Sequence, residues 1–224
     1  MNVLSLETST DVCSVALLCG TRLHVREAAA GQKHSEIILP MIEALLNETG
    51  IGVADLDGVA FGAGPGSFTG LRIACGVAQG LAFGCDIPVA PVSTLQALAA
   101  ASGATRVIAC LDARMGEVYH AVFERRADTW QEWIAPNLCA PGSAPEVEGD
   151  GWTGCGSGFE AHRTALEARY GYRLAGIREG LFPHAREVAE LGSKALAAGL
   201  GVAAERALPL YIRDKVALKM DERK

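Results

Sequence analysis

The feature that most constrains the fold is a pattern that occurs twice along the chain. In each half, a short apolar segment ends in an acid, Leu6-Glu7 or Leu111-Asp112. The segments that follow shortly after, 11–17 and 117–123, align with each other without a gap. Apolar segments joined by a polar turn are typical of a β-hairpin. We interpret the pattern as a duplicated β-meander, although the low identity leaves open the alternative of two unrelated hairpins.

The first half alternates predicted strands and helices. Apolar residues at helical spacing follow Ser35, and Gly50 ends that segment. A buried strand, a glycine-rich loop at 62–70 and a second helical segment come next, in an order typical of α/β proteins. The expected strands are 3–7, 13–19, 22–27, 59–61, 89–92 and 107–111, and the expected helices are 35–49, 69–84 and 95–101.

The second half is less regular. We expect a strand at 130–138, a loop at 140–150, helices at 159–170 and 185–198, and a short extended segment at 208–213. The chain is therefore predicted to be an α/β protein of two lobes. The N-terminal lobe at 1–103 is the complete one, and the C-terminal lobe at 104–224 is smaller and degenerate.

Composition limits the class of protein. Half of the 224 residues are hydrophobic, enough for a sizeable core, and the net charge of -6 argues against a broad basic groove for nucleic acid. The longest apolar stretch, which lies between Arg72 and Asp86, is shorter than the roughly 20 residues of a bilayer span, and the N-terminus does not resemble a secretory signal. The seven cysteines are scattered, as in a reducing compartment. We expect a soluble, cytoplasmic protein with no membrane segment.

The glycine-rich loop at 62–70 has two possible roles. It could bind phosphate at a helix N-terminus, but it contains no lysine and matches neither standard phosphate-binding template. Alternatively, its glycines permit a tight turn and close packing. In the helix that follows, Gly76, Gly80 and Gly84 recur every fourth residue and form a smooth ridge. That ridge suits either a partner helix or the sheet of the chain itself.

Side chains capable of catalysis are few. The five histidines are far apart in sequence, so the residues predict no metal site. His34-Ser35-Glu36 could hold an acid-base pair, but helix capping explains these residues more simply. Ser67 and Ser157 are not in a nucleophile elbow. We therefore expect no catalytic residue and no cofactor.

Several motifs are specific enough to indicate a family. They are Leu6-Glu7-Thr8-Ser9, His34–Pro40, Gly64–Arg72, Pro91–Leu95, Asp112–Tyr119 and Pro209–Arg213. These motifs resemble those of the TsaB (YeaZ) family. The match is specific over residues 1–123 and thin through the middle of the second half.

The resemblance implies the duplicated, ribonuclease H-like fold of the actin, sugar-kinase and heat-shock-ATPase superfamily. It also implies a role, with the catalytic paralogue TsaD and the ATPase TsaE, in placing threonylcarbamoyl on the adenosine beside the tRNA anticodon. Helices 35–49 and 69–84 would form the surface shared by a homodimer and the TsaB–TsaD heterodimer. The expected interface residues are His34, Ile38, Met41, Ile42, Leu45, Arg72, Gly76, Gln79 and Gly80.

The catalytic paralogue carries V-N-H-M-E-G-H, whose two histidines bind a metal ion. At the similar position this chain has Val92–Leu98, with Thr94 and Leu98 in place of the histidines. The resemblance therefore implies no metal and makes an activity as a metalloprotease the weakest of the alternatives.

Two main hypotheses follow from the sequence. The first is a non-catalytic scaffold that binds the paralogue and contacts tRNA only through the complex. The second is a nucleotide-dependent enzyme with ATP near Thr8, Ser9, Gly64 and Asp112. Direct RNA contact by the charged C-terminal tail, through Arg213, Lys215, Lys219, Arg223 and Lys224, stays open because acids offset these cations.

Overall fold

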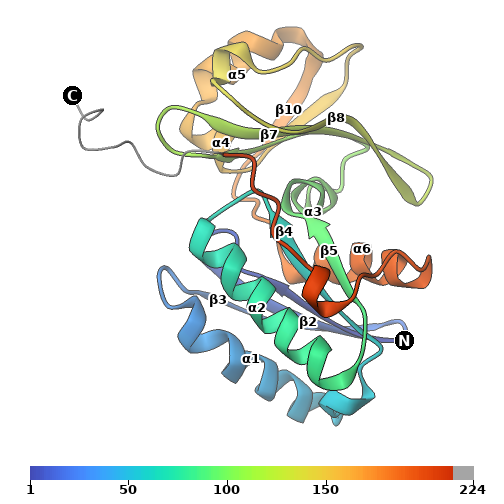
Figure 1. Ribbon diagram of the computed structural model, residues 1–224. Coiled ribbons are helices and arrows are strands. Elements are labelled where there is room, and N and C mark those ends of the chain that lie inside the picture. Colours follow the sequence, from blue (N-terminus) through green and yellow to red (C-terminus); the bar gives the residue numbers. More distant parts are fainter. Residues whose placement is uncertain (214–224) are drawn as a thin grey trace.

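The computed structural model describes residues 1–213, so the predictions for the tail beyond Arg213 lie outside the described residues. Each of the two lobes is built on a five-stranded sheet (Figure 1). The N-terminal sheet has the order β3-β2-β1-β4-β5, and the C-terminal sheet has the order β10-β9-β6-β7-β8. The strands of the first are β1 (Asn2–Glu7), β2 (Val12–Cys19), β3 (Arg22–Ala29), β4 (Gly58–Gly64) and β5 (Val89–Ser93). Those of the second are β6 (Arg106–Asp112), β7 (Val118–Arg126), β8 (Thr129–Cys139), β9 (Trp152–Cys155) and β10 (Leu174–Arg178).

The two sheets are copies of one topology. In each, three consecutive strands form an antiparallel meander, and a parallel strand pairs with the first strand of that meander. Read from the meander edge, both sheets have the order third, second, first, fourth, fifth strand. The predicted duplication is confirmed, and the alternative of two unrelated hairpins is excluded.

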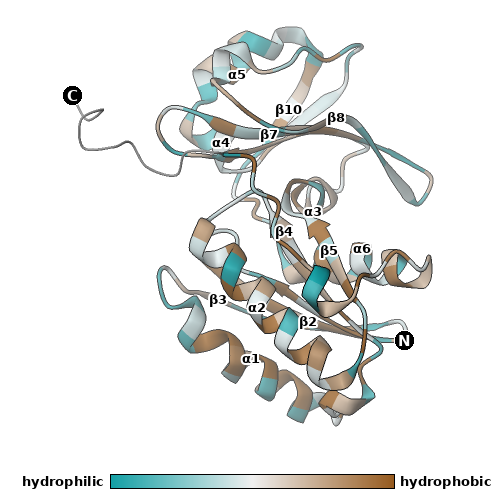
Figure 2. Ribbon diagram, in the orientation of Figure 1, coloured by the Kyte–Doolittle hydropathy of each residue, from teal (hydrophilic) through white to brown (hydrophobic). Residues whose placement is uncertain are grey.

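Within residues 1–213, six α-helices surround the sheets. They are α1 (His34–Thr49), α2 (Phe68–Cys85), α3 (Thr94–Ala101), α4 (Ser157–Ala161), α5 (Arg163–Tyr170) and α6 (Ala185–Ala197). Helices α1 and α2 cover one face of the N-terminal sheet, where their apolar residues pack against Leu4, Leu6 and Val15. Helix α6 covers the opposite face, where Val188 packs against Val3 and Ala60. Apolar residues run along both α1 and α2 (Figure 2).

Helix α6 corrects the predicted lobe boundary. The sequence analysis placed it in the C-terminal lobe, but its first residue is bonded to two strands of the N-terminal sheet. Ser5 Oγ donates to the Ala185 carbonyl at 2.7 Å, and the Ala185 N–H donates to Ser14 Oγ at 2.9 Å. Gly192 lies so close to the sheet that an added Cβ would be 2.3 Å from Ala60 Cβ. The N-terminal lobe therefore consists of residues from both ends of the chain.

Other differences from prediction are local. Strands β9 and β10 were not predicted, and the expected helix at 159–170 is two helices, α4 and α5, that meet at His162. The expected capping at His34–Glu36 is wrong: Lys33 occupies the N-cap of α1, and no side chain caps that helix. Instead of capping the helix, His34 turns inward, and its Nε2 lies 2.8 Å from the Thr10 carbonyl oxygen. The sequence shows no signal for this long-range contact.

Helix α2 has 18 residues and is long and apolar enough, by length and composition alone, to cross a membrane. The sequence analysis had judged this stretch too short. Core helices pass the same test, and the buried residues of α2, among them Leu71, Ala74 and Ala78, lie in the N-terminal lobe.

Candidate functional site

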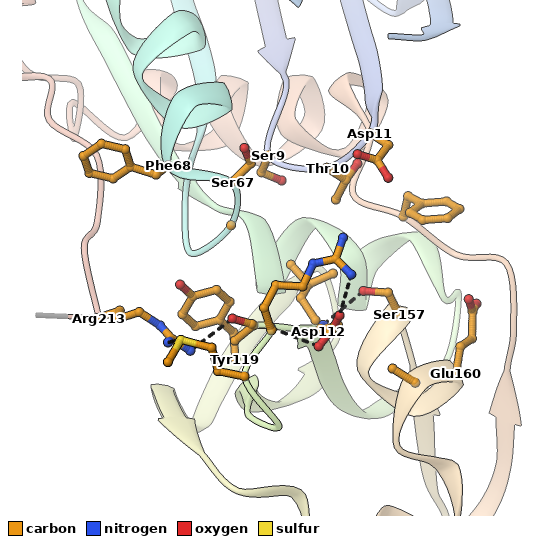
Figure 3. A pocket seen from close by; sticks show the side chains of 17 residues that line it. Ser9, Thr10, Asp11, Ser67, Phe68, Asp112, Tyr119, Ser157, Glu160 and Arg213 are labelled. Atoms are coloured by element: carbon orange, nitrogen blue, oxygen red, sulfur yellow. Dashed lines mark hydrogen bonds and ion pairs between the residues drawn. The ribbon is translucent and has the colours of Figure 1, made fainter. Parts of the chain in front are cut away.

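A cleft of about 700 Å³ separates the two lobes (Figure 3). The β1–β2 turn and the glycine-rich loop contribute Ser9, Thr10, Asp11, Gly66, Ser67 and Phe68 from the N-terminal lobe. The C-terminal lobe contributes Leu111, Asp112, Ala113, Arg114, Met115, Tyr119, Ser157, Glu160 and Ala161. Phe182 and Arg213 also line the cleft. The cleft therefore lies where the duplicated strands β1 and β6 both end.

Asp112 is the polar centre of the cleft floor. Its Oδ1 accepts a bond from the Arg114 N–H at 3.0 Å, and its Oδ2 accepts one from Arg114 Nη1 at 3.2 Å. His162 Nε2 lies 3.5 Å from Oδ1, and the Asp112 N–H donates to Ser157 Oγ at 3.1 Å. The carboxylate is thus already paired within its own lobe. Figure 3 shows Asp112 beside Ser157, on the side of the cleft opposite Ser9, Thr10 and Ser67.

The glycine-rich loop is pressed against the β1–β2 turn. A Cβ added to Gly70 would lie 1.9 Å from the Thr8 carbonyl oxygen, and one added to Gly66 would lie 2.6 Å from Ser9 Cβ. The Ser67 N–H donates to the Ser9 carbonyl at 2.8 Å. Close packing therefore explains these glycines, because the space beside their backbone belongs to another part of the chain.

The four residues expected around a nucleotide separate into two pairs. Ser9 and Asp112 line the cleft. Thr8 and Gly64 are buried behind it, where Thr8 Oγ1 donates to the Gly70 carbonyl at 2.7 Å. Both arginines of the cleft have carboxylate partners, since Arg114 pairs with Asp112 and Arg213 with Glu117. Phosphate groups in this cleft would have to compete with these carboxylates.

Glu7 lies at the end of β1 and is fully buried. Its Oε1 accepts a bond from the Ser9 N–H at 2.6 Å, while its Oε2 has no partner and faces Gly62, where an added Cβ would be 1.9 Å away. Burial raises the pKa of this carboxyl to about 7, although the bonds from Ser9 and Thr8 oppose the shift. The side chain is therefore uncharged over part of the neutral range.

We expect the pKa of Glu7 to make the fold less stable as the pH rises. A carboxyl whose pKa is higher in the folded chain than in the unfolded one stabilises the fold fully below the unfolded value of 4.5. That stabilisation is lost as the pH rises through about 7. Glu7→Gln removes the titration, so its stability relative to the natural chain should increase by roughly 2 kcal/mol from pH 5 to pH 8. Urea unfolding at several pH values measures this difference.

Two variants serve as controls for that experiment. Glu43→Gln changes an exposed glutamate of α1 and should follow the natural chain at every pH. Burial also raises the pKa of Glu187 to about 7, so Glu187→Gln should remove a further part of the pH dependence. Stability curves of Glu7→Gln and the natural chain that run parallel from pH 5 to pH 8 would contradict the assignment.

The structure corrects the interface expected on α1. Ile38, Ile42 and Leu45 are buried in the core between α1 and the N-terminal sheet, and His34 is buried beside Thr10. These four residues are covered by the chain itself and do not form a free surface. Met41 is partly buried against the same core. The helical periodicity of α1 was predicted correctly, but the apolar face that it marks packs against the sheet of the same lobe and not against a partner.

The outward face of α2 carries the glycine ridge. Gly76 and Gly80 are exposed, and a Cβ added to either would meet nothing within 4 Å. The alternative in which the ridge packs against the sheet is therefore excluded. Phe83, which follows Gly76 and Gly80 at helical spacing, has 79% of its surface exposed. The sequence analysis missed Phe83 because an aromatic residue in an apolar helix is usually predicted to be buried in the core.

Two further predicted interface residues of α2 contact the C-terminal segment. Arg72 Nε donates to Tyr211 Oη at 2.9 Å, and Gln79 Nε2 donates to the Ala207 carbonyl at 2.9 Å. These residues belong to the side of α2 beside the segment 207–213. The outward surface of the helix is therefore defined by Gly76, Gly80 and Phe83.

The positions that resemble the metal ligands of the paralogue lie inside the protein. Thr94 is buried, and its Oγ1 donates to the Pro65 carbonyl. Leu98 is buried in a core cluster of the C-terminal sheet. Each position thus has a packing or hydrogen-bonding role within this chain.

The repeated topology and the cleft between the lobes define a duplicated α/β protein of the actin and heat-shock-ATPase type. A family model described as TsaD, tRNA N6-adenosine threonylcarbamoyltransferase, matches residues 26–219. The tRNA threonylcarbamoyladenosine biosynthesis protein TsaB of Haemophilus influenzae is 39% identical, over 98% of this chain and 96% of that protein. The Escherichia coli protein of the same name is 36% identical, over 98% and 97%. The solved structure of YeaZ from Pseudomonas aeruginosa is 39% identical, with a TM-score of 0.86 over 94% of this chain and 99% of that one. The chain belongs to the TsaB (YeaZ) family.

Proposed function

We propose that the chain acts in tRNA threonylcarbamoyladenosine biosynthesis as a non-catalytic subunit. It binds a catalytic paralogue of the TsaD type, which receives threonylcarbamoyl from an activated donor and transfers it to the adenosine. An ATPase of the TsaE type completes the complex, and tRNA is contacted through that complex. The names of the full-length relatives support the pathway. The exposed glycine face of α2 supports the mode of binding.

The glycine face favours a helix as the partner. A helix with glycine at every fourth position lets a second helix approach more closely than larger side chains allow. Phe83 adds a large apolar side chain at the end of that face, and burial of such a residue contributes strongly to association. A second copy of the chain can use the same face when the paralogue is absent. The homodimer and the heterodimer are therefore expected to compete.

The chemistry of the cleft supports a non-catalytic role. The Asp112 carboxylate is bonded to Arg114, and the glycine-rich loop fills the space beside Thr8 and Ser9. Thr94 and Leu98 replace the two histidines that the resemblance places in the paralogue. The chain would then act by ordering the paralogue, with no side chain of its own entering the reaction.

A reconstitution in which single components are left out tests this function. It contains tRNA, threonylcarbamoyl-adenylate, the paralogue and the ATPase, with or without this chain, and modified adenosine is measured by mass spectrometry. We expect product only when the chain is present. Asp112→Asn, which removes the charge at the centre of the cleft, should leave the yield unchanged.

The other outcomes are equally informative. Loss of product with a folded Asp112→Asn variant would move the chemistry into the cleft and favour the nucleotide-dependent enzyme. Equal product with and without the chain would contradict a role in the transfer.

A further inference from the structure

The motif Pro209–Arg213 was singled out in the sequence, and the proposed function does not use it. In the structure this segment leaves the N-terminal lobe and runs to the C-terminal lobe (Figure 1). Its first anchor lies on the N-terminal sheet, where the Leu210 N–H donates to the Ala63 carbonyl at 2.7 Å. Gly64 is its neighbour there, since an added Cβ would be 2.8 Å from the Leu210 carbonyl oxygen.

The second anchor is the first turn of α2. Tyr211 Oη accepts a bond from Arg72 Nε, and the Tyr211 ring lies 5.5 Å from the Phe68 ring, centroid to centroid. The Arg72 guanidinium carbon lies 3.7 Å from the centroid of the Phe68 ring, within the range of a cation–π interaction. These contacts attach the segment to the helix that carries the glycine face.

The third anchor lies on the C-terminal lobe. Arg213 Nη2 donates to Glu117 Oε2 at 2.8 Å and to the Ala113 carbonyl at 3.0 Å. The Arg213 side chain is 12% exposed and the Glu117 side chain 36%, so the pair is partly shielded from water. Both acceptors flank the β6–β7 turn, in which Arg114 and Met115 have positive φ angles of 62° and 57°. One guanidinium thus holds both sides of a turn that lines the cleft.

We propose that residues 207–213 form an inter-lobe strap, whose Arg213–Glu117 pair fixes the β6–β7 turn against the N-terminal lobe and so positions the walls of the cleft. A segment with three anchors on two lobes restricts hinge motion more strongly than a covalent link without anchors. Opening the cleft requires that at least one of the three anchors break. The strap also joins the cleft to α2 through Tyr211 and Arg72. This inference goes beyond the proposed function and is tested on the chain alone.

Hydrogen–deuterium exchange followed by mass spectrometry tests the strap. Glu117→Gln weakens the third anchor from the C-terminal side and keeps the shape of the side chain. We expect exchange to become about tenfold faster at 111–118 and also at 65–71, which lies in the other lobe. Arg213→Ala should have the same effect to a larger extent. Tyr211→Phe, which removes only the bond to Arg72, should accelerate exchange at 65–71.

A matched control removes a different arginine of the C-terminal lobe. Arg163 pairs with Glu167 and Glu179 at the surface, and no hydrogen bond or ion pair joins it to residues 207–213, so Arg163→Ala should leave exchange at 65–71 unchanged. Faster exchange confined to 207–213 in Glu117→Gln would overturn the proposal, because the segment would then be a passive terminus. Equal acceleration at 65–71 in Arg163→Ala would overturn it as well. If Arg213→Ala unfolds, Glu117→Gln still decides the question.

Discussion

Replacing Gly76 with leucine will abolish association with the TsaD-type paralogue and will leave the isolated chain slightly more stable. The new side chain enters open space in the chain itself, since nothing lies within 4 Å of an added Cβ. Leucine also favours a helix more than glycine does, by about 0.5–1 kcal/mol. In the proposed complex, however, the same side chain would occupy the space of the partner helix. The dissociation constant should rise at least about 100-fold, which is about 3 kcal/mol.

Analytical ultracentrifugation of the variant with the paralogue measures the association, and urea unfolding measures the stability. Gly142→Leu is the matched control, because it adds the same side chain at another glycine with open space, on the C-terminal lobe. That control should bind normally. A Gly76→Leu variant that still forms the complex would show that the outward face of α2 is not the docking surface.

The second large effect concerns stability alone. Gly70→Ala adds a single methyl group, but that group would lie 1.9 Å from the Thr8 carbonyl oxygen. Because the clash is with backbone, neither a rotamer change nor a flexible side chain can relieve it. We expect a loss of about 3 kcal/mol or more in the free energy of unfolding, measured by urea denaturation.

Gly80→Ala makes the same change in the same helix, where an added Cβ meets nothing within 4 Å. It should stabilise the chain by about 0.5–1 kcal/mol, so the two variants are expected to differ in sign. A Gly70→Ala variant as stable as Gly80→Ala would mean that the glycine-rich loop is not held against the β1–β2 turn.

The sequence predicts the duplicated sheets because the evidence for them is local. A strand that ends in an acid and continues into a hairpin occurs in both halves, and the structure pairs these segments in the same way. Strands β9 and β10 escaped prediction because they are short and contain Gly154 and Gly176. Such segments become strands only when a neighbouring strand supplies hydrogen-bonding partners.

The candidate site is harder to predict because it depends on what lies opposite each residue. Ile38 and Leu45 mark one face of a helix, and periodicity cannot say whether a sheet or a partner covers that face. Likewise, the spacing of Gly66 and Gly70 cannot separate phosphate binding from close packing. The positions of Thr8 and Ser9 beside these glycines, which only the fold supplies, decide for close packing.

The return of α6 to the N-terminal sheet also affects the order in which the chain can fold during synthesis. All strands of the C-terminal sheet come from one uninterrupted stretch, 106–178, which can fold as soon as it has been made. The strands of the N-terminal sheet are synthesised first, but their packing is complete only after α6 has been made. Ala185 of that helix bonds to Ser14, a residue 171 positions earlier. Until then Val3 and Ala60 lack their cover, and contacts between residues so far apart in sequence form slowly. The nascent chain therefore exposes one apolar sheet face for most of its synthesis, which makes that face a natural target for chaperones.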